Sequence, residues 1–302
     1  MAEHEKPVRI LEFHIDGRQA GQTVREYLNH TVKLSKRQIS SLKYRDDGIV
    51  LNGAPVRVTC MLAEGDVLKI GLKTAGSLYL DHGSFDTPLQ ILYEDEDILA
   101  VNKPAGMVCH PSPGHYADSL ANQAAAYCAE KGEDWTIRIF GRLDKDTSGI
   151  VLFAKNSETA ALLEKQRKAG LFSKTYTALA EGIISEDVSV VDVPVGPDDT
   201  VRGKMKADAD GKPAFTKVTV LERRNDSTLV SLQLTFGRTH QIRVHLAYAG
   251  HPLVGDSMYG NGIKGKTYAH LCATEVSFVQ PFSGKEIHLT VPCPFQDGNI
   301  TH

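Results

Sequence analysis

The chain has 302 residues, of which 41% are hydrophobic and 24% are charged, and its formal net charge is −3. This composition is ordinary for a soluble globular protein, and the charge gives no overall sign of a polyanionic partner. No stretch approaches the roughly 20 apolar residues of a membrane span, and no apolar segment behind the N-terminus resembles a secretory signal. The length allows one large core or two domains.

The cysteines are few and scattered: Cys60, Cys109, Cys128, Cys272 and Cys293. Their odd number argues against a disulfide framework, and the lack of a CxxC pair or a Cys/His cluster argues against a structural zinc site. We therefore expect a reduced cytoplasmic protein that is monomeric and has neither a metal nor a membrane partner.

Two local runs of basic residues contrast with the modest net charge. The first, between residues 33 and 45, holds Lys33, Lys36, Arg37, Lys43 and Arg45 with no acid before the last of them. The second, between residues 202 and 217, holds five cations against two aspartates. Such faces could dock phosphates, and each run taken alone fits a solvated surface equally well.

The N-terminal third predicts a small α/β unit. A strand is expected over residues 8–14, followed by a helix capped by Thr23 with Glu26 at capping-box spacing. A second helix fits residues 35–42, with Ser35 as its cap and Ile39 and Leu42 facing inward. The Asn52-Gly53 pair predicts a hairpin turn with a returning strand over residues 55–58, and a last strand covers residues 67–70.

This unit resembles the S4 RNA-binding domain over residues 21–72. The resemblance lies in three segments, Leu34-Ser-Lys-Arg37, Val50-Leu-Asn-Gly53 and Glu64-Gly-Asp-Val67. It implies that Ser35, Lys36 and Arg37 face a phosphate backbone. The alternative is a small α/β cap that binds no ligand. We take residues 1–72 as the first domain and residues 73–88 as a linker.

The second domain is expected over residues 89–302. A hairpin fits residues 89–104, and helices fit residues 119–131 and 158–169, the latter ending at Gly170. Further strands are predicted over residues 173–180, 188–195, 215–222 and 229–236. Strands without regular β-α-β alternation indicate an α+β domain with a mixed, largely antiparallel sheet and flanking helices.

The loop from Gly141 to Gly149 carries the candidate catalytic carboxylate, Asp144. It precedes the strand-like run of residues 150–154, and active-site groups are often mounted on loops that a rigid element positions. Asp146 lies two residues away and is the rival candidate. An ionised carboxylate beside an anomeric carbon can attack it or stabilise positive charge there.

Four segments of the second domain are similar to the RluA family of pseudouridine synthases. They are Val101-Asn-Lys-Pro-Ala-Gly106, the Arg142-Leu-Asp144 loop, Lys174-Thr-Tyr-Thr-Ala178, and the stretch from Gly237 through Arg243 to Gly255-Asp-Ser-Met-Tyr-Gly260. A weaker fifth begins at His270. The resemblance implies isomerisation of uridine in RNA to pseudouridine, with no cofactor. Many members have His where this chain has Gly141, so an essential role for that His is in doubt.

The resemblance also assigns roles to residues. Asp144 is the catalytic carboxylate. Tyr176 stacks on the target uracil, and its hydroxyl is a candidate for removing the C5 proton. Leu271 resembles the apolar residue that lines the uracil pocket, and core packing is an equally good interpretation of it. We assign Asp146 a loop-ordering role and expect Arg142 to fill the place of the extruded base. Lys174 flanks Tyr176, and we predict that Arg238 and His240 contact phosphate at the mouth of the site.

Arg243 is the candidate partner of Asp144, because a buried carboxylate is costly without a cation beside it. The segment from Thr239 to Ala249 can be read as a strand by alternation. A helix is preferred, with Ile242, Leu246 and Ala249 inward and Gly250 ending it.

Three functions remain to be weighed. The resemblance favours an isomerase acting on large-subunit (23S) ribosomal RNA or a ribosome-assembly intermediate, while transfer RNA is the other substrate class. A ribosome-assembly factor with an unused catalytic domain is the second reading. A carbohydrate hydrolase using Asp144 and Asp146 is the third, and it lacks aromatic sugar platforms, since Trp135 is the single tryptophan.

Overall fold

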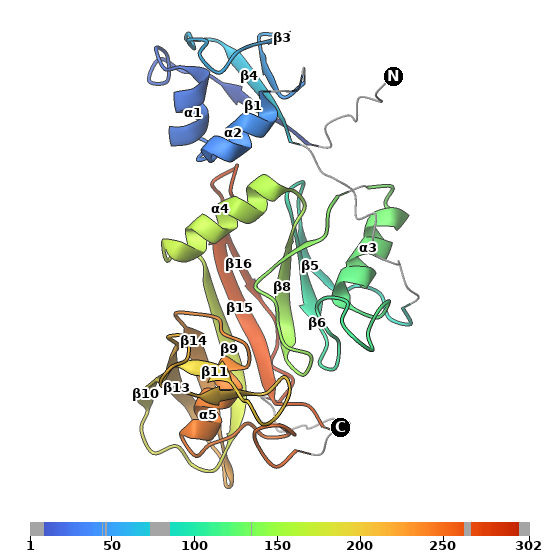
Figure 1. Cartoon of the computed structure of the whole chain (residues 1–302), viewed down its shortest axis with the longest axis vertical. Helices are drawn as coiled ribbons and strands as arrows, with labels where there is room; N and C mark the ends of the chain where they lie inside the picture. The colour runs from blue at the N-terminus through green and yellow to red at the C-terminus, as the bar shows by residue number, and fades with distance from the viewer. Residues whose placement is uncertain are drawn as a thin grey trace.

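The computed structural model describes residues 9–43, 45, 47–72, 85–133, 135–262 and 267–295. A small N-terminal unit stands at one end of an elongated molecule, and a larger unit makes up the rest (Figure 1). Most of the expected linker, residues 73–84, lies outside the described residues. In the part of the chain that is described, no helix is long and apolar enough to cross a membrane. The five cysteines all lie in the described residues, and none of them forms a disulfide.

The N-terminal unit is a four-stranded sheet with two helices. The strands are β1 (Arg9–His14), β2 (Ile49–Leu51), β3 (Ala54–Pro55) and β4 (Val67–Leu72), and their order is β1-β4-β2-β3. The helices are α1 (Val24–His30) and α2 (Lys36–Leu42). Apolar residues of helices and strands, among them Leu28, Ile39, Leu68 and Ile70, form a core separate from those of the larger unit.

Local rules account for most of this unit. Thr23 and Glu26 form the expected capping box, and Ser35 forms a second one with Gln38. Asn52 and Gly53 both have positive φ, as a tight hairpin turn requires. The returning strand ends at Pro55 instead of residue 58, because the Val58 carbonyl accepts the Arg25 N–H at the start of α1 and leaves the sheet.

The larger unit is built on a ten-stranded sheet with the order β10-β13-β14-β9-β15-β8-β6-β5 along its main path, and β16 and β7 pair with β15 and β8. The strands are β5 (Ile91–Glu94), β6 (Ile98–Lys103), β7 (Arg138–Phe140), β8 (Ser148–Ala154), β9 (Ser173–Glu181), β10 (Val188–Asp192), β13 (Phe215–Arg223), β14 (Ser227–Leu234), β15 (Leu271–Val279) and β16 (Glu286–Thr290). A separate ribbon consists of β11 (Val195–Pro197) and β12 (Met205–Ala207). Among the described pairings only β8–β15 is parallel, which confirms the expected mixed, largely antiparallel sheet.

Alternating residues of the central strands point to two different cores. Ile98, Ala100, Ile150 and Leu152 belong to a cluster that includes Leu163 of α4 (Ser157–Lys168). Their neighbours on the same strands belong to a cluster with α3 (Leu120–Glu130). Farther along the sheet, a third cluster packs against α5 (Gln241–Tyr248). One face of the sheet is therefore covered by α4, and the other carries α3 near β6 and β8 and, at a distance along the sheet, α5 (Figure 1).

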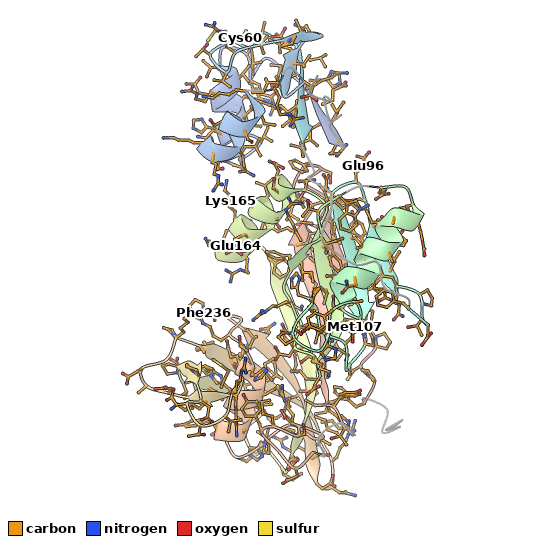
Figure 2. All side chains as sticks on the ribbon, turned by 45° about the vertical axis from the view of Figure 1, so that its right-hand side comes forward. Cys60, Glu96, Met107, Glu164, Lys165 and Phe236 are labelled. Carbon is orange, nitrogen blue, oxygen red and sulfur yellow. The ribbon has the colours of Figure 1, made fainter. Side chains whose placement is uncertain are left out.

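The α4 end of the larger unit meets the N-terminal unit. Arg9 forms ion pairs with Glu96 and with the buried Asp97, and Lys165 of α4 donates to the Lys33 carbonyl. Glu96 and Lys165 both lie at this end in Figure 2. Phe282 adds an apolar contact to the N-terminal core. The two units therefore meet through both charged and apolar contacts.

Two expectations for the larger unit were wrong. The strand expected over residues 188–195 is divided between β10 and β11, because the Val193 and Pro194 carbonyls bond outside the sheet, to His245 and to the Asp208 N–H. Ala249 is exposed although it was expected to face inward. The remaining helix expectations are confirmed, including α5 and the positive-φ glycines, Gly170 and Gly250, after α4 and α5.

We predict that Gly149→Ala strongly destabilises the larger unit. A Cβ at this position would lie 2.3 Å from the Ala273 carbonyl oxygen and 2.6 Å from the Ala273 nitrogen, across the β8–β15 pairing. We expect a loss of about 2–4 kcal/mol in the free energy of unfolding, measured by urea denaturation. Gly170→Ala is the matched control, since its φ is also positive but open space surrounds it, and it should cost about 1 kcal/mol. Equal losses in the two variants would contradict the close-approach argument.

Candidate active site

The Asp144 loop is held in place by backbone contacts from neighbouring segments. The Asp144 carbonyl accepts the Thr147 N–H at 3.2 Å, which closes a turn directly before β8. One residue earlier, the Leu143 N–H donates to the Cys109 sulfur and its carbonyl accepts from the same thiol. One residue later, the Lys145 carbonyl accepts the Gly106 N–H at 2.8 Å. The carboxylate thus projects from a backbone that is fixed on both sides.

A buried lysine contributes to the same support. Lys103 ends β6 with no exposed surface, and its ammonium donates to the carbonyls of Pro104, Met107 and Lys145 at 2.8, 2.7 and 3.1 Å. Burial lowers the pKa of Lys103 to about 8. The three carbonyls satisfy the donors of the charged form, so this cation ties the turn at residues 104–107 to the catalytic loop.

Most of the predicted site residues converge on one small pocket of about 80 Å³. Those that line it are Asp144, Tyr176, Arg243, Arg142, Arg238, His240 and Leu271. They come from the Asp144 loop, β9, the loop before α5, α5 itself and β15. The fold therefore brings together residues that are as much as 129 positions apart in sequence.

Tyr176 lies where two of the apolar clusters meet, and it packs against both. Burial and then the negative charge of Asp144 raise the pKa of Tyr176 above that of an ordinary tyrosine. Its hydroxyl therefore keeps its proton in this site. A neutral ring of this kind is suited to stacking on a base.

Lys174, two residues earlier on β9, faces the same loop. Its ammonium donates to the Gly141 carbonyl at 2.9 Å and lies 5.6 Å from the centre of the Tyr176 ring. Burial lowers the pKa of Lys174 to about 7. These contacts give Lys174 a part in holding the loop, while its contact with RNA stays a prediction.

Arg243 has a different partner from the one expected. The guanidinium forms two 2.7 Å hydrogen bonds with the Asp256 carboxylate, and both side chains are buried. It also lies 3.7 Å from Asp146, whereas no ion pair within 4.0 Å joins it to Asp144 in the described residues. The expected direct pair with Asp144 was therefore wrong. Two nitrogens of the Arg243 guanidinium, Nε and Nη2, bond the Asp256 carboxylate in a bidentate arrangement instead. Asp146 has a contact that fits its assigned role in ordering the loop.

His240 precedes α5, and its imidazole faces the Asp144 carboxylate. Its Nε2 atom lies 4.0 Å from Asp144 Oδ2, and Nδ1 lies 2.9 Å from the Tyr259 hydroxyl. Burial lowers the pKa of His240 below its ordinary value. The positive charge of Arg243 lowers this pKa further, whereas the negative charges of Asp144, Asp256 and Asp146 raise it without outweighing burial. The imidazole is therefore neutral at pH 7, which does not favour the phosphate contact expected of it.

Two arginines stand at the mouth of the pocket. Arg142 is exposed and donates to the Thr239 hydroxyl at 3.3 Å, from one wall of the pocket to the other. Arg238 donates to the Pro213 carbonyl at 3.0 Å, and its guanidinium covers the ring of Phe236. Figure 2 shows Phe236 at the upper left of the lower part of the molecule. Both cations are thus placed at the margin of the site.

The three predicted residues of the N-terminal unit do not line this pocket. Lys36 and Arg37 are exposed on α2. The Ser35 N–H and hydroxyl are both engaged with Gln38 in the capping box. Ser35 therefore has a structural task, whereas the two cations are open to solvent.

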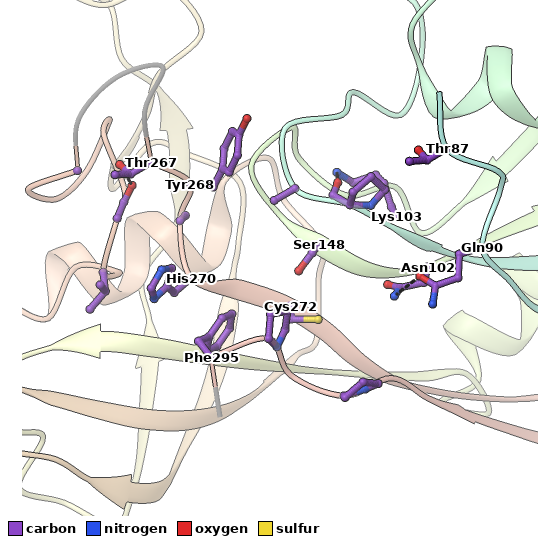
Figure 3. Close-up of a pocket in the computed structure, with 18 of the residues that line it drawn as sticks. Thr87, Gln90, Asn102, Lys103, Ser148, Thr267, Tyr268, His270, Cys272 and Phe295 are labelled. Atoms are coloured by element: carbon purple, nitrogen blue, oxygen red, sulfur yellow. Dashed lines mark hydrogen bonds between the residues drawn. The ribbon is translucent and has the colours of Figure 1, made fainter. Parts of the chain in front are cut away.

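A larger cavity of about 800 Å³ is lined in part by Lys103 and Ser148. Figure 3 shows Lys103, Ser148, His270, Cys272 and Phe295 on its walls. None of Asp144, Tyr176 and Arg243 lines it. The small pocket is the candidate active site although it is the smaller of the two, because it holds the three candidate catalytic side chains. No group of three or more residues able to hold a metal ion occurs in the described ranges.

Sequence reasoning gave no role to Asp256 and Tyr259. Asp256 accepts the N–H groups of Met258 and Tyr259 through Oδ1 while it binds Arg243. An aspartate followed by residues that bond back to its side chain is a common turn pattern, and the glycines at 255 and 260 strengthen it. That signal could have indicated the turn, though not the partner of its carboxylate.

The profile of the RNA pseudouridylate synthase family matches residues 97–248. An uncharacterized RNA pseudouridine synthase of Bacillus subtilis, YlyB, is 39% identical over 257 residues, which is 83% of each chain. Ribosomal large subunit pseudouridine synthase D of Neisseria meningitidis serogroup A is 33% identical over 84% of this chain and 71% of the relative. The solved structure of human RNA pseudouridylate synthase domain containing 1 matches with a TM-score of 0.56 and 27% identity, over 72% of this chain and 87% of that one.

We predict that Asp256→Asn lowers the free energy of unfolding by about 3–5 kcal/mol at pH 7, because it leaves Arg243 buried without its countercharge. Burial alone would raise the pKa of Asp256, but the hydrogen bonds and charge of Arg243 outweigh it and hold the pKa below its ordinary value. The stabilisation is therefore present above about pH 4 and is lost as the pH falls through the lower folded value. Urea denaturation at pH 7 and pH 3 should show a smaller acid effect in the variant. Asp187→Asn, at an exposed ion pair with Arg223, is the control and should change little.

Proposed function

The chain belongs to the RNA pseudouridylate synthase family, and we propose that it isomerises a uridine of large-subunit ribosomal RNA with Asp144 as the catalytic carboxylate. The family membership confirms the enzyme class that the sequence indicated: the chain is an RNA pseudouridine synthase. The observation that carries the residue assignment is the convergence of Asp144, Tyr176 and Arg243 on one pocket.

The choice of ribosomal RNA rests on the named relatives. The Neisseria relative is a ribosomal large subunit synthase, and relatives with the same name occur in Nitrosomonas europaea and Zymomonas mobilis. We extend that substrate class to this chain as 23S ribosomal RNA or an assembly intermediate, in preference to transfer RNA. Such a substrate would place the enzyme in the cytoplasm.

The proposed reaction exchanges one glycosidic bond for another. The bond from C1′ of the ribose to N1 of uracil breaks, the base turns while it stays bound, and C5 bonds to C1′. The proton from C5 is lost and N1 gains one, so the product is an isomer and no cofactor is consumed. Asp144 begins the reaction either by attacking C1′ or by removing the C2′ proton to give a glycal.

The other pocket residues support this chemistry in distinct ways. Tyr176 offers its ring to the uracil, and its retained proton argues against a phenolate that is ready to act as a base. Leu271 is buried and forms an apolar wall. Arg142 and Arg238 would meet phosphates or the vacated base position at the mouth. Arg243 contributes positive charge near Asp144 while it is bound to Asp256.

We predict that Asp144→Asn folds and binds RNA like the wild type but forms no detectable pseudouridine. Asp146→Asn is the matched variant from the same loop: it removes the negative charge that lies 3.7 Å from Arg243 and should retain measurable activity. Each variant would be expressed in a strain lacking this gene, and pseudouridines would be mapped in total RNA. Near wild-type modification by Asp144→Asn would refute the assignment. If deletion of the gene removed no pseudouridine, an assembly factor would be the better reading.

We also propose that the N-terminal unit is an S4-like domain that docks RNA through α2. Lys36 and Arg37 project from its first turn, and the described acids of the unit lie on other segments. Each phosphate contact releases counterions, so it contributes to the salt dependence of binding.

The double variant Lys36→Ser/Arg37→Ser should bind ribosomal RNA more weakly and with a flatter salt dependence. We expect the slope of log K against log salt concentration to fall by about 1–2, because two phosphate contacts are lost. Filter binding between low and moderate salt would measure it. Lys168→Ser/Lys285→Ser removes the same charge from exposed positions of the larger unit and should leave the slope nearer the wild-type value. Equal slopes for both double variants would count against docking through α2.

A further inference from the structure

His240 occupies an unusual backbone conformation at the edge of the pocket. Its φ of 55° and ψ of 15° lie in the left-handed region, which is costly for a residue with a side chain. Such strain persists where the surrounding contacts fix the residue, and it concentrates at functional sites. Here one ring nitrogen is held by a hydrogen bond, since Nδ1 lies 2.9 Å from the Tyr259 hydroxyl, while Nε2 faces Asp144 Oδ2 at 4.0 Å.

The proton of the Tyr259 hydroxyl has one evident destination. A backbone N–H can only donate, and the N–H of Met205 donates to the Tyr259 oxygen at 2.8 Å. The hydroxyl proton is left for the remaining neighbour, His240 Nδ1. Burial raises the pKa of Tyr259 to about 12, so the hydroxyl keeps that proton across the physiological range.

The tautomer of His240 follows from this arrangement. If Nδ1 accepts from Tyr259, a neutral imidazole carries its own proton on Nε2, the atom that faces Asp144. The opposite tautomer would aim the Nε2 lone pair at a carboxylate and would leave the Tyr259 proton without its acceptor. Electrostatics and hydrogen bonding therefore favour the same state.

We propose that Tyr259 is a positioning residue that fixes His240 as the Nε2–H tautomer, and that His240 thereby offers an N–H donor to the Asp144 carboxylate. The proposal rests on the proposed role of Asp144. In the structure the donor and acceptor are 4.0 Å apart, so a small side-chain movement forms the bond. Holding one carboxylate oxygen leaves the other to face the ribose.

The network keeps Tyr259 itself in place. Asp256 accepts the Tyr259 N–H at 3.1 Å, and the same carboxylate binds Arg243. The cations of Arg243 and Lys204 lie 5.1 and 5.4 Å from the centre of the Tyr259 ring.

The charged groups around His240 come from three segments. They are Asp144 and Asp146 from the catalytic loop, Arg243 from α5 and Asp256 from the segment that follows it.

Nitrogen-15 NMR of the imidazoles tests the tautomer without any substrate. The full-length protein, labelled on histidine, would be compared at pH 7 with His240→Gln, whose missing resonances identify His240. We expect the Nε2–H pattern in the wild type and a shift toward a tautomer mixture in Tyr259→Phe. A wild-type Nδ1–H tautomer or an imidazolium would overturn the proposal.

Kinetics test whether the tautomer matters for the reaction. Tyr259→Phe keeps the ring but removes the hydroxyl, and with it the hydrogen bond to His240. Because one hydrogen bond is lost, we expect the single-turnover rate to fall by about 3- to 10-fold. Tritium release from [5-³H]uridine-labelled 23S ribosomal RNA would report that rate, and RNA affinity should stay within about twofold of the wild type. Tyr248→Phe, at an exposed position of α5, is the matched control and should not change the rate.

Substitution of His240 completes the test. Gln keeps an N–H donor near the Nε2 position whereas Leu does not, so His240→Gln should be faster than His240→Leu. An unchanged rate in Tyr259→Phe, or equal rates in the two His240 variants, would overturn the proposal. Neither result would test the role of Asp144, because the Asp144→Asn variant tests that role separately.

Discussion

The short parallel contact between β8 and β15 is the constraint on which the site depends. The parallel register contains just two residue pairs, Ser148 with Cys272 and Gly149 with Ala273. The same contact joins the part of the sheet under α3 to the part that carries α5. The Asp144 loop ends where β8 enters this contact, so the carboxylate is set against β9 and β15. A glycine is required there because a neighbouring backbone occupies the space of a Cβ.

The charges of the site are distributed over a network instead of a single pair. Arg243 holds Asp256 at two atoms and Asp146 at a longer distance, while the carboxylate assigned to catalysis retains only a distant contact with His240. A bidentate partner would occupy both oxygens of Asp144 and compete with a substrate. Giving the tight pair to Asp256 leaves Asp144 accessible beside a fixed positive charge.

Local patterns in the sequence predicted the elements whose determinants are local. The capping residues Thr23 and Ser35, the Asn52-Gly53 turn and the glycine after α4 all gave correct boundaries. The family resemblance located the pocket residues, and the family comparison confirmed the enzyme class. The partner of Arg243 could not be predicted, because it depends on how a turn 13 residues away folds back on α5. β15 and β16 were also missed, since β15 mixes polar and apolar residues and its central place depends on long-range pairing.

The small volume of the pocket bears on which molecules can react. Sites for small ligands commonly measure about 300–1,000 Å³, and this one measures about 80 Å³ with Arg142 and Thr239 bonded across it. Asp144 keeps 26% of its side chain exposed, so a base can reach it, but so small a hollow offers the base little binding surface. A polynucleotide can add contacts far from the reacting base, whereas a free nucleoside has none to offer. The small pocket therefore makes chain length itself a criterion of selection, before any base is recognised.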